Sequence, residues 1–363
     1  MTPRAFLRRP SHERALSLAA VVIVALMAAL NWPRFLTEGN AISMAYQLPI
    51  VAFLSLGMMV TMVTGGINLA IIATANFTGI VTVLLLRALA GDAADAAGAG
   101  VALVAMAGGL AAAMAVGALM GWLIAYVEVP AILATLAFMT LLNGVNLVIT
   151  RGYTLSGFPE FLIAIGNGTV GPVPIPFLLL VVAVILLGLV LRRTQTGLAF
   201  YLVGSNPVAA AYSNIRVRRV LVRTYVLSSV FAALTAFIMM GQLNSVKANY
   251  AESYLLVSVL ACFLGGVDPF GGAGTLAGMV LAVVILQVVS TGVNLLRMDP
   301  FFIQAMWGFI ILALVALSFA GDRLRERRRL RAARVLRGAP PAASPPAPPA
   351  PKPTAAVTPG ERS

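Results

Sequence analysis

Uncharged hydrogen-bonding side chains are the residues of this sequence whose types and spacing are suited to bind a solute. They recur inside apolar stretches, several of them at helical spacing, and the set is Asn68, Asn76, Asn143, Asn146, Gln287, Thr291 and Asn294. A passage lined by such groups suits a neutral, hydroxyl-rich solute, whereas an ion pump more often needs carboxylates within the membrane. Taken singly, each is better explained by hydrogen bonding between helices. Taken as a set, they favour a lined cavity.

Groups for catalysis or metal binding are scarce in this chain. The one cysteine, Cys262, lies inside an apolar stretch, and the one histidine, His12, precedes the first such stretch. These counts exclude a disulfide within the chain and disfavour cysteine- or histidine-ligated metal and serine–histidine–aspartate chemistry. The sequence has no GxxxxGK[ST] phosphate loop, so it cannot hydrolyse ATP by that route. We therefore expect no catalytic residues, no metal and no cofactor.

Ten apolar stretches contain or adjoin these polar groups, and none of the ten contains Asp, Glu, Lys or Arg. Of the 363 residues, 60% are hydrophobic and 10% charged, which is too little polar surface for a soluble domain. A helix needs about 20 apolar residues to cross the hydrocarbon core, and a β-barrel would show alternating polarity instead. We predict spans over residues 15–31, 43–63, 69–86, 101–127, 131–150, 177–191, 224–243, 253–267, 273–293 and 300–320. The spans at 177–191 and 253–267 are short enough to be re-entrant or tilted.

The net charge of +13 is unevenly distributed along the chain. With ten spans and a cytoplasmic N-terminus, eighteen arginines fall on the inner side and only five basic residues on the outer side. This asymmetry follows the positive-inside rule, so the charge orients the protein and does not indicate nucleic-acid binding. The N-terminus resembles a signal peptide but has no clear small-x-small cleavage site before Asn31, so we expect a retained first helix.

A basic loop between Arg192 and Arg223 interrupts the apolar stretches. Within it, Asn206 and Pro207 predict the start of a short helix, because Asn caps free N–H groups and proline fits the first turn. Turns are expected before this helix at Gly197 and Gly204. A short helix on the positive side is either a handle for a soluble partner or an interfacial helix whose arginines reach the lipid surface.

Glycine pairs break the chain at two places, Gly65-Gly66 before Asn68 and Gly265-Gly266 before Asp268. Such breaks free backbone groups, which a membrane tolerates only beside protein or water. Discontinuous helices at a transport cavity are one explanation. Tight cytoplasmic turns between spans are the other, and we favour them slightly.

The domain organisation follows from these patterns. We predict a basic cytoplasmic lead-in over 1–14 and one membrane domain over 15–320, which includes the loop 192–223. Residues 321–337 form an Arg-rich segment that anionic lipid would attract. Residues 338–363 are rich in proline and alanine and predict a disordered tail.

Four segments, at 65–81, 129–145, 194–215 and 265–278, resemble the membrane subunit of bacterial ABC importers for ribose, xylose and galactose. They read GGINLAIIATANFTGIV, VPAILATLAFMTLLNGV, TQTGLAFYLVGSNPVAAAYSNI and GGVDPFGGAGTLAG. The family's corresponding patterns are GGIDLSVG, P-x-x-x-T-L-x-x-M, T-x-x-G-R-x-x-x-A-x-G-x-N-x-x-A-A-x-x-S-G-I and GG-x-x-x-x-GG-x-G-x-x-x-G. The resemblance covers about 45–320.

This resemblance implies an all-α membrane protein of about ten transmembrane helices, some of them broken or re-entrant, in a bundle like that of type II ABC importers. It implies a bacterial inner-membrane location with both termini cytoplasmic. It also implies a second permease chain, two ATPase domains inside, on one or more separate subunits, and a periplasmic binding protein that delivers a monosaccharide. The segment that couples to the ATPase would include Gly204, Asn206, Pro207, Ala210, Tyr212 and Arg216.

The chain departs from the family pattern at four positions. Asn68 replaces an Asp, Ala70 a Ser, Leu198 an Arg, and Asn214 a Gly. These changes bear on the choice of substrate and partner, and they leave open whether the permease pairs as a homodimer or a heterodimer. Nucleosides or branched-chain amino acids remain alternative solutes. A sodium-coupled secondary transporter is the second hypothesis, and a membrane enzyme is a third that the missing catalytic groups disfavour.

Overall fold

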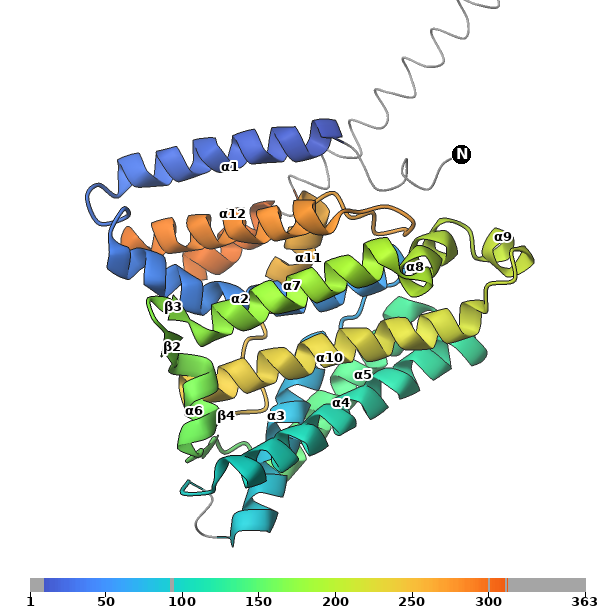
Figure 1. The fold of residues 1–363 in the computed structure, drawn as a ribbon, viewed down its shortest axis with the longest axis horizontal. Helices are drawn as coiled ribbons and strands as arrows, with labels where there is room; N and C mark the ends of the chain where they lie inside the picture. Colours follow the sequence, from blue (N-terminus) through green and yellow to red (C-terminus); the bar gives the residue numbers. More distant parts are fainter. Residues whose placement is uncertain (1–9, 92–94, 300, 311, 313–363) are drawn as a thin grey trace, which may run out of the picture. The chain divides into compact units, whose positions relative to one another are not determined.

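Helices dominate this computed structural model, which describes residues 10–91, 95–299, 301–310 and 312 (Figure 1). The first six helices are α1 (Pro10–Leu30), α2 (Glu38–Val63), α3 (Ile71–Ala90), α4 (Ala99–Tyr126), α5 (Ala131–Thr150) and α6 (Glu160–Asn167). The next six are α7 (Ile175–Arg193), α8 (Gln195–Ser205), α9 (Pro207–Tyr212), α10 (Val217–Leu243), α11 (Tyr254–Leu264) and α12 (Leu276–Leu295). A further short apolar helix covers Phe301–Ile310.

Four two-residue strands form two small antiparallel pairs. Strand β1 (Leu155–Ser156) pairs with β4 (Ser245–Val246), and β2 (Thr169–Val170) pairs with β3 (Val173–Pro174). Figure 1 shows α6, β2 and β3 near one end of the bundle and α8 with α9 at the other. We refer to the latter as the α9 end.

The described residues up to 310 belong to one compact unit, residues 1–311, and Leu312 is the one described residue of the second unit. Most of the predicted lead-in 1–14, the Arg-rich segment 321–337 and the tail 338–363 lie outside the described residues. Residues 10–14 of the lead-in begin α1.

Among the described residues, seven helices are long and apolar enough to cross a membrane: α2, α3, α4, α5, α7, α10 and α12. Three further apolar segments are shorter over the described residues, Leu16–Leu30 within α1, Tyr254–Leu264 and Phe301–Ile310. Residues 311 and 313–320 of the last predicted span lie outside the described residues, so the predicted count of ten full spans is not confirmed. The stretch at 177–191 is not short in the structure, because α7 extends it to 19 residues with a proline in its first turn. The stretch at 253–267 contains the 11-residue α11 and ends at the glycine pair.

Helix α10 is central and packs against α2, α3 and α4. Its contact with α4 depends on small residues, because a Cβ atom at Gly121 would lie 2.7 Å from the Cα of Val222, and one at Gly117 would lie 2.6 Å from the carbonyl oxygen of Tyr225. Small residues on one face let two helix backbones approach closely. The α4–α10 pair is therefore held at backbone contact.

Both glycine breaks are helix ends of the same kind. Gly65 (φ +84°) and Gly266 (φ +78°) adopt the left-handed conformation just after α2 and α11. Each donates its N–H to the carbonyl three residues earlier, and the next residue donates to the carbonyl five residues earlier, over 2.9 to 3.0 Å. This is the Schellman arrangement, which favours glycine at the left-handed position. The breaks therefore end helices and begin turns.

Candidate functional site

The basic segment after α7, expected to be a loop with one short helix, contains two helices, α8 and α9. Thr194 Oγ1 caps α8 by accepting a hydrogen bond from the Gly197 N–H at 3.1 Å. Asn206 Oδ1 caps α9 by accepting from the Ala209 N–H at 2.9 Å, with Pro207 in the first turn. The predicted helix start at Asn206 and Pro207 is confirmed. The prediction of turns at Gly197 and Gly204 is wrong, because both residues lie inside α8.

These two glycines serve close packing instead. A Cβ atom at Gly197 would lie 2.5 Å from the Cα of Leu191 in α7. A Cβ atom at Gly204 would lie 2.6 Å from the amide nitrogen of Gly272, and closer still to the carbonyl oxygen of Val63. No larger residue fits at Gly204 without moving backbone atoms.

Three segments far apart in the sequence meet at what we call the glycine junction, formed by Gly65 after α2, Gly204 in α8, and Gly271 with Gly272 between α11 and α12. The Gly272 N–H donates to the carbonyl of Val63 at 2.9 Å. A Cβ atom at Gly271 would lie 2.8 Å from both the Gly204 oxygen and the Gly65 nitrogen. The contacts therefore join the backbone of α8 to the end of α2 and to the α11–α12 loop.

Tyr201 adds a side-chain link to the junction. Its hydroxyl donates to the carbonyl of Gly274 at 3.0 Å from a buried position in α8. Burial raises the pKa of Tyr201 to about 12, although the charge of Arg192 acts in the opposite direction. The hydroxyl is therefore protonated at neutral pH and available as a donor.

Helix α9 has a buried face and an exposed face. Ala210 is buried, whereas Val208 and Tyr212 are 64% and 90% exposed. Positions 208 and 212 are four apart, so they lie on one face of the helix. Asn214 follows with φ +61°, a conformation that asparagine tolerates, which explains how it replaces the family's glycine. Arg216 is exposed just before α10.

Asn68 begins a line of buried polar groups next to the glycine junction. Its Nδ2 donates to Ser228 Oγ of α10 at 2.9 Å, and its Oδ1 accepts from the Ala70 N–H at 3.1 Å. A carboxylate at position 68 would lack the donor that reaches Ser228. Farther along α3, Asn76 Nδ2 donates to the carbonyl of Ala248 at 3.0 Å.

Three buried polar atoms along α5 and α10 have no hydrogen-bond partner within the described part of the chain. They are Asn146 Oδ1, Tyr225 Oη and Ser229 Oγ. The amide of Asn146 makes one long hydrogen bond, from Nδ2 to the carbonyl of Ala73 at 3.3 Å. An unpaired buried acceptor costs free energy, so these atoms are suited to pair with another molecule or in another conformation.

We define the polar seam as Asn68, Asn76, Asn146, Tyr225, Ser228 and Ser229. Sequence analysis missed the last three, although a serine pair and a tyrosine inside the apolar stretch 224–243 were a usable signal. The polar seam contains three of the seven predicted path residues, Asn68, Asn76 and Asn146, which lie on or beside α3.

The other four predicted path residues lie apart from the seam. Gln287 Nε2 donates to Gln47 Oε1 of α2 at 3.1 Å, and this hydrogen bond joins α12 to α2. Gln287 Nε2 also donates to Thr291 Oγ1 within α12 at 3.2 Å. Asn143 is half-buried on α5, and Asn294 is exposed near the end of α12. The structure therefore places the seven residues in two buried groups and two separate positions.

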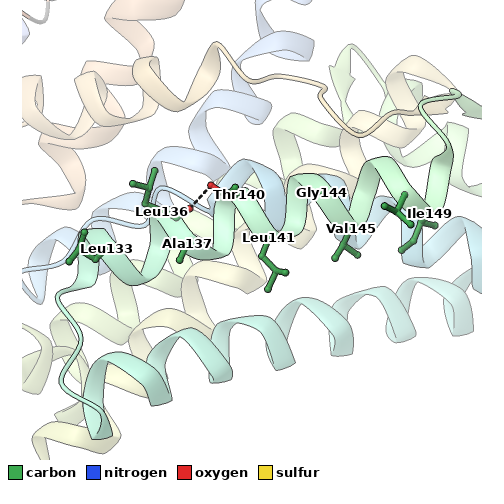
Figure 2. Close-up of a pocket in the computed structure, with 9 residues that line it drawn as sticks. Leu133, Leu136, Ala137, Thr140, Leu141, Gly144, Val145 and Ile149 are labelled. Atoms are coloured by element: carbon green, nitrogen blue, oxygen red, sulfur yellow. Dashed lines mark hydrogen bonds between the residues drawn. The ribbon is translucent and has the colours of Figure 1, made fainter.

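Hollows in the described part of the chain are lined by residues other than the predicted path residues. One is an apolar groove of about 860 Å³ along α5, shown in Figure 2, with Leu133, Leu141 and Ile149 among its walls. Thr140, the one hydroxyl residue of this groove, donates its Oγ1 hydrogen to the carbonyl of Leu136 at 3.1 Å. A small apolar cavity lies between α2, α7 and α12, and two further grooves lie between α7 and α12 and between α4 and α10. Among the described residues, no group of three or more His, Cys, Asp or Glu could hold a metal ion.

Comparison with known proteins identifies the family. A family model described as "Branched-chain amino acid transport system / permease component" matches residues 40–318. The chain belongs to this permease family. Together with the seven long apolar helices, this makes the permease a multi-pass membrane protein.

Curated relatives of the permease carry sugar-transport names. It is 30% identical over 311 residues to the ribose import permease protein of Escherichia coli (strain K12), covering 84% of this chain and 93% of the relative. It is 30% identical over 307 residues to the ribose import permease protein of Bacillus subtilis (strain 168), covering 83% and 91%. It is 26% identical over 313 residues to the L-arabinose transport system permease protein of Escherichia coli (strain K12), covering 85% and 90%. No solved structure matches the permease.

Proposed function

We propose that this permease is the membrane-spanning subunit of an ATP-driven importer of a monosaccharide. A periplasmic binding protein delivers the sugar, and separate ATPase subunits supply the energy. The sugar names of the relatives support the solute class, since they include ribose and L-arabinose import. The polar seam supports it as well, because its amides and hydroxyls carry no charge and suit a solute rich in hydroxyl groups.

The observation that carries the coupling role is the glycine junction. Helix α9 presents Val208 and Tyr212 outward, where an ATPase subunit can hold them, and α8 connects α9 to the end of α2. The first seam residue, Asn68, follows that end by a few residues. Movement of α9 therefore reaches the seam through backbone contacts at Gly204 and Gly272 rather than through flexible side chains.

We assign the α9 end to the cytoplasm. The arginines of the segment 192–223 lie at this end, at the end of α7 and the start of α10. Positive charge of this density next to spans is typical of the cytoplasmic side. The coupling helix and the ATPase subunits would then lie on the same side of the membrane.

A second permease chain, identical or divergent, completes the path in this proposal. Helix α5 has the smallest buried share of the seven long apolar helices, 22%, and it carries the half-buried Asn143 and the unpaired Asn146 Oδ1. A partner packed along α5 would enclose the half-buried Asn143 away from lipid, whereas Asn146 is already buried within this chain. The departures from the family pattern at Asn68 and Leu198 fit a homodimer that imports a different sugar, or one half of a heterodimer.

Branched-chain amino acids are a second candidate solute, favoured by the description of the matching family. The described seam has no charged side chain to pair with an amino or carboxylate group. Uptake of radiolabelled leucine in the sugar assay below, with no uptake of pentoses, would select this candidate over sugars.

The test is uptake by proteoliposomes that contain the permease, its ATPase and its binding protein. We expect uptake of a pentose or hexose with ATP inside, and none with an ATPase subunit that cannot hydrolyse ATP. Uptake that continues with the inactive ATPase would remove the proposal. Uptake by the permease alone under a sodium gradient would replace it with a sodium-coupled secondary transporter.

A further inference from the structure

An apolar groove with a basic end runs between α4 and α10. It has a volume of about 700 Å³ and is lined by Leu119, Trp122 and Tyr126 of α4 and by Arg219, Val222 and Arg223 of α10. Residues three or four apart share a face of a helix, so each helix presents one face to the groove. The combination of apolar walls with two arginines matches a molecule that has both an apolar chain and an anionic group.

The floor of the groove is the close contact of the two helices. A Cβ atom at Gly121 would lie 2.7 Å from the Cα of Val222. Because the backbones touch there, the larger side chains on either side of the contact form the walls of the groove. The groove therefore lies along a closely packed pair of helices.

The arginines of the groove are free to bind an anion. Arg219 and Arg223 are exposed, and neither has an ion pair with any residue that the structure describes. The neighbouring Arg218 differs, since it pairs with Glu128 at 3.5 Å and stacks over the ring of Tyr126 at 5.4 Å. Guanidinium groups bind phosphate through several directed hydrogen bonds.

The aromatic residues place this end of the groove at the membrane surface. Trp122 and Tyr126 are 52% and 45% exposed and lie in the last turns of α4, a helix that is otherwise apolar. Tryptophan and tyrosine are enriched at the level of lipid headgroups. The two arginines therefore lie where a lipid phosphate lies, and Leu119 lies toward the hydrocarbon core.

A second groove repeats this composition. It has a volume of about 660 Å³ between α7 and α12, with Ile185, Leu189 and Val280 as apolar walls and Arg192 with Arg193 at one end. The two grooves adjoin the two ends of the segment that holds α8 and α9. A ligand common to both would hold the chain just before α8 and just after α9.

We infer that the α4–α10 groove binds one anionic phospholipid, with its phosphate on Arg219 and Arg223 and an acyl chain along Leu119 and Val222, and that the α7–α12 groove is a second site of the same class. Basic pockets between transmembrane helices are suited to anionic headgroups. A free phosphate would use the arginines alone and leave the apolar walls uncovered. A second copy of this chain would offer Glu128, the acidic side chain described beside this face, but Arg218 already pairs with it.

Native mass spectrometry of the full chain tests this inference, with protein released from vesicles of phosphatidylethanolamine and phosphatidylglycerol in equal amounts. We expect two bound phosphatidylglycerol molecules on the natural sequence. The double variant Arg219→Gln with Arg223→Gln should lose one of them, with roughly 30-fold weaker binding at that site. The control is Arg34→Gln with Arg151→Gln, which removes the same charge at the opposite end of the bundle and should keep both lipids.

A second variant separates the groove from its charge. Ala118→Trp fills the groove and keeps both arginines, so it should also lose one lipid. Retention of both lipids by this variant or by the arginine pair would overturn the inference. So would complete displacement by inorganic phosphate, which would indicate a simple anion site, or crosslinking of two copies through Leu119→Cys, which would indicate a protein partner.

Discussion

The amide of Gly272 donates a hydrogen bond to the carbonyl of Val63 across 2.9 Å, joining the α11–α12 loop to the end of α2. Gly204 of α8 lies against this pair closely enough that a Cβ atom would meet both residues. The loop that follows the second glycine pair therefore contacts the chain at the first glycine pair. That contact joins the backbones of α8, the end of α2 and the α11–α12 loop.

Gly204→Ala should uncouple the importer. Its Cβ would meet Gly272 and Val63, so the backbones must separate, at a cost of about 1–3 kcal/mol of stability. We expect uptake in proteoliposomes to fall at least tenfold while ATPase turnover continues. The matched control is Gly39→Ala in the first turn of α2, where a Cβ meets nothing within 4 Å, and it should transport normally. Normal transport by Gly204→Ala would show that the junction does not transmit motion.

Val208→Ala with Tyr212→Ala should weaken ATPase binding without unfolding the permease. Both side chains are exposed on α9, and exposed substitutions usually change stability by less than about 0.5 kcal/mol. We expect co-purification with the ATPase to be lost and the melting temperature to be kept. Val170→Ala with Tyr153→Ala removes the same residue types from exposed positions outside the α9 end and should leave ATPase binding intact.

Asn68 and Ser228 should be energetically coupled. Asn68→Ala leaves Ser228 and the Ala70 N–H without their partner, so we expect a loss of about 1–3 kcal/mol in free energy of unfolding. Adding Ser228→Ala should cost less than in the natural sequence, with a coupling of about 0.6 kcal/mol. Denaturation in detergent micelles measures the four proteins of this cycle. Strict additivity would mean that the hydrogen bond contributes nothing.

Tyr201→Phe should cost about 1 kcal/mol near neutral pH, because the carbonyl of Gly274 loses its donor. The pKa of Tyr201 is raised to about 12 from an ordinary 10.0, so the unfolded chain ionises first as pH rises. The contribution of this residue to stability is therefore complete below pH 10 and declines between about pH 10 and 12. Melting temperatures from pH 7 to 11 should show a decline above pH 10 that is smaller in Tyr201→Phe. An identical decline in both proteins would contradict the assignment.

Sequence alone determined the features that depend on neighbouring residues. The apolar stretches predicted the long helices α2, α3, α4, α5, α7, α10 and α12 because hydrophobic length is a local property. Asn206 with Pro207 predicted the start of α9 because capping involves residues three apart. The resemblance in four segments identified the permease family, which the match over 40–318 confirms.

Only the tertiary structure decided the roles that depend on distant contacts. Gly204 reads as a turn in the sequence, but Val63 and Gly272 make it a packing position inside α8. Asn68 finds its partner 160 residues away in Ser228, and Asn146 keeps an unpaired oxygen among neighbours that no local pattern predicts. The physical reason is that hydrogen-bond satisfaction and close packing are set by which chain segments meet, and helix periodicity does not encode that pairing.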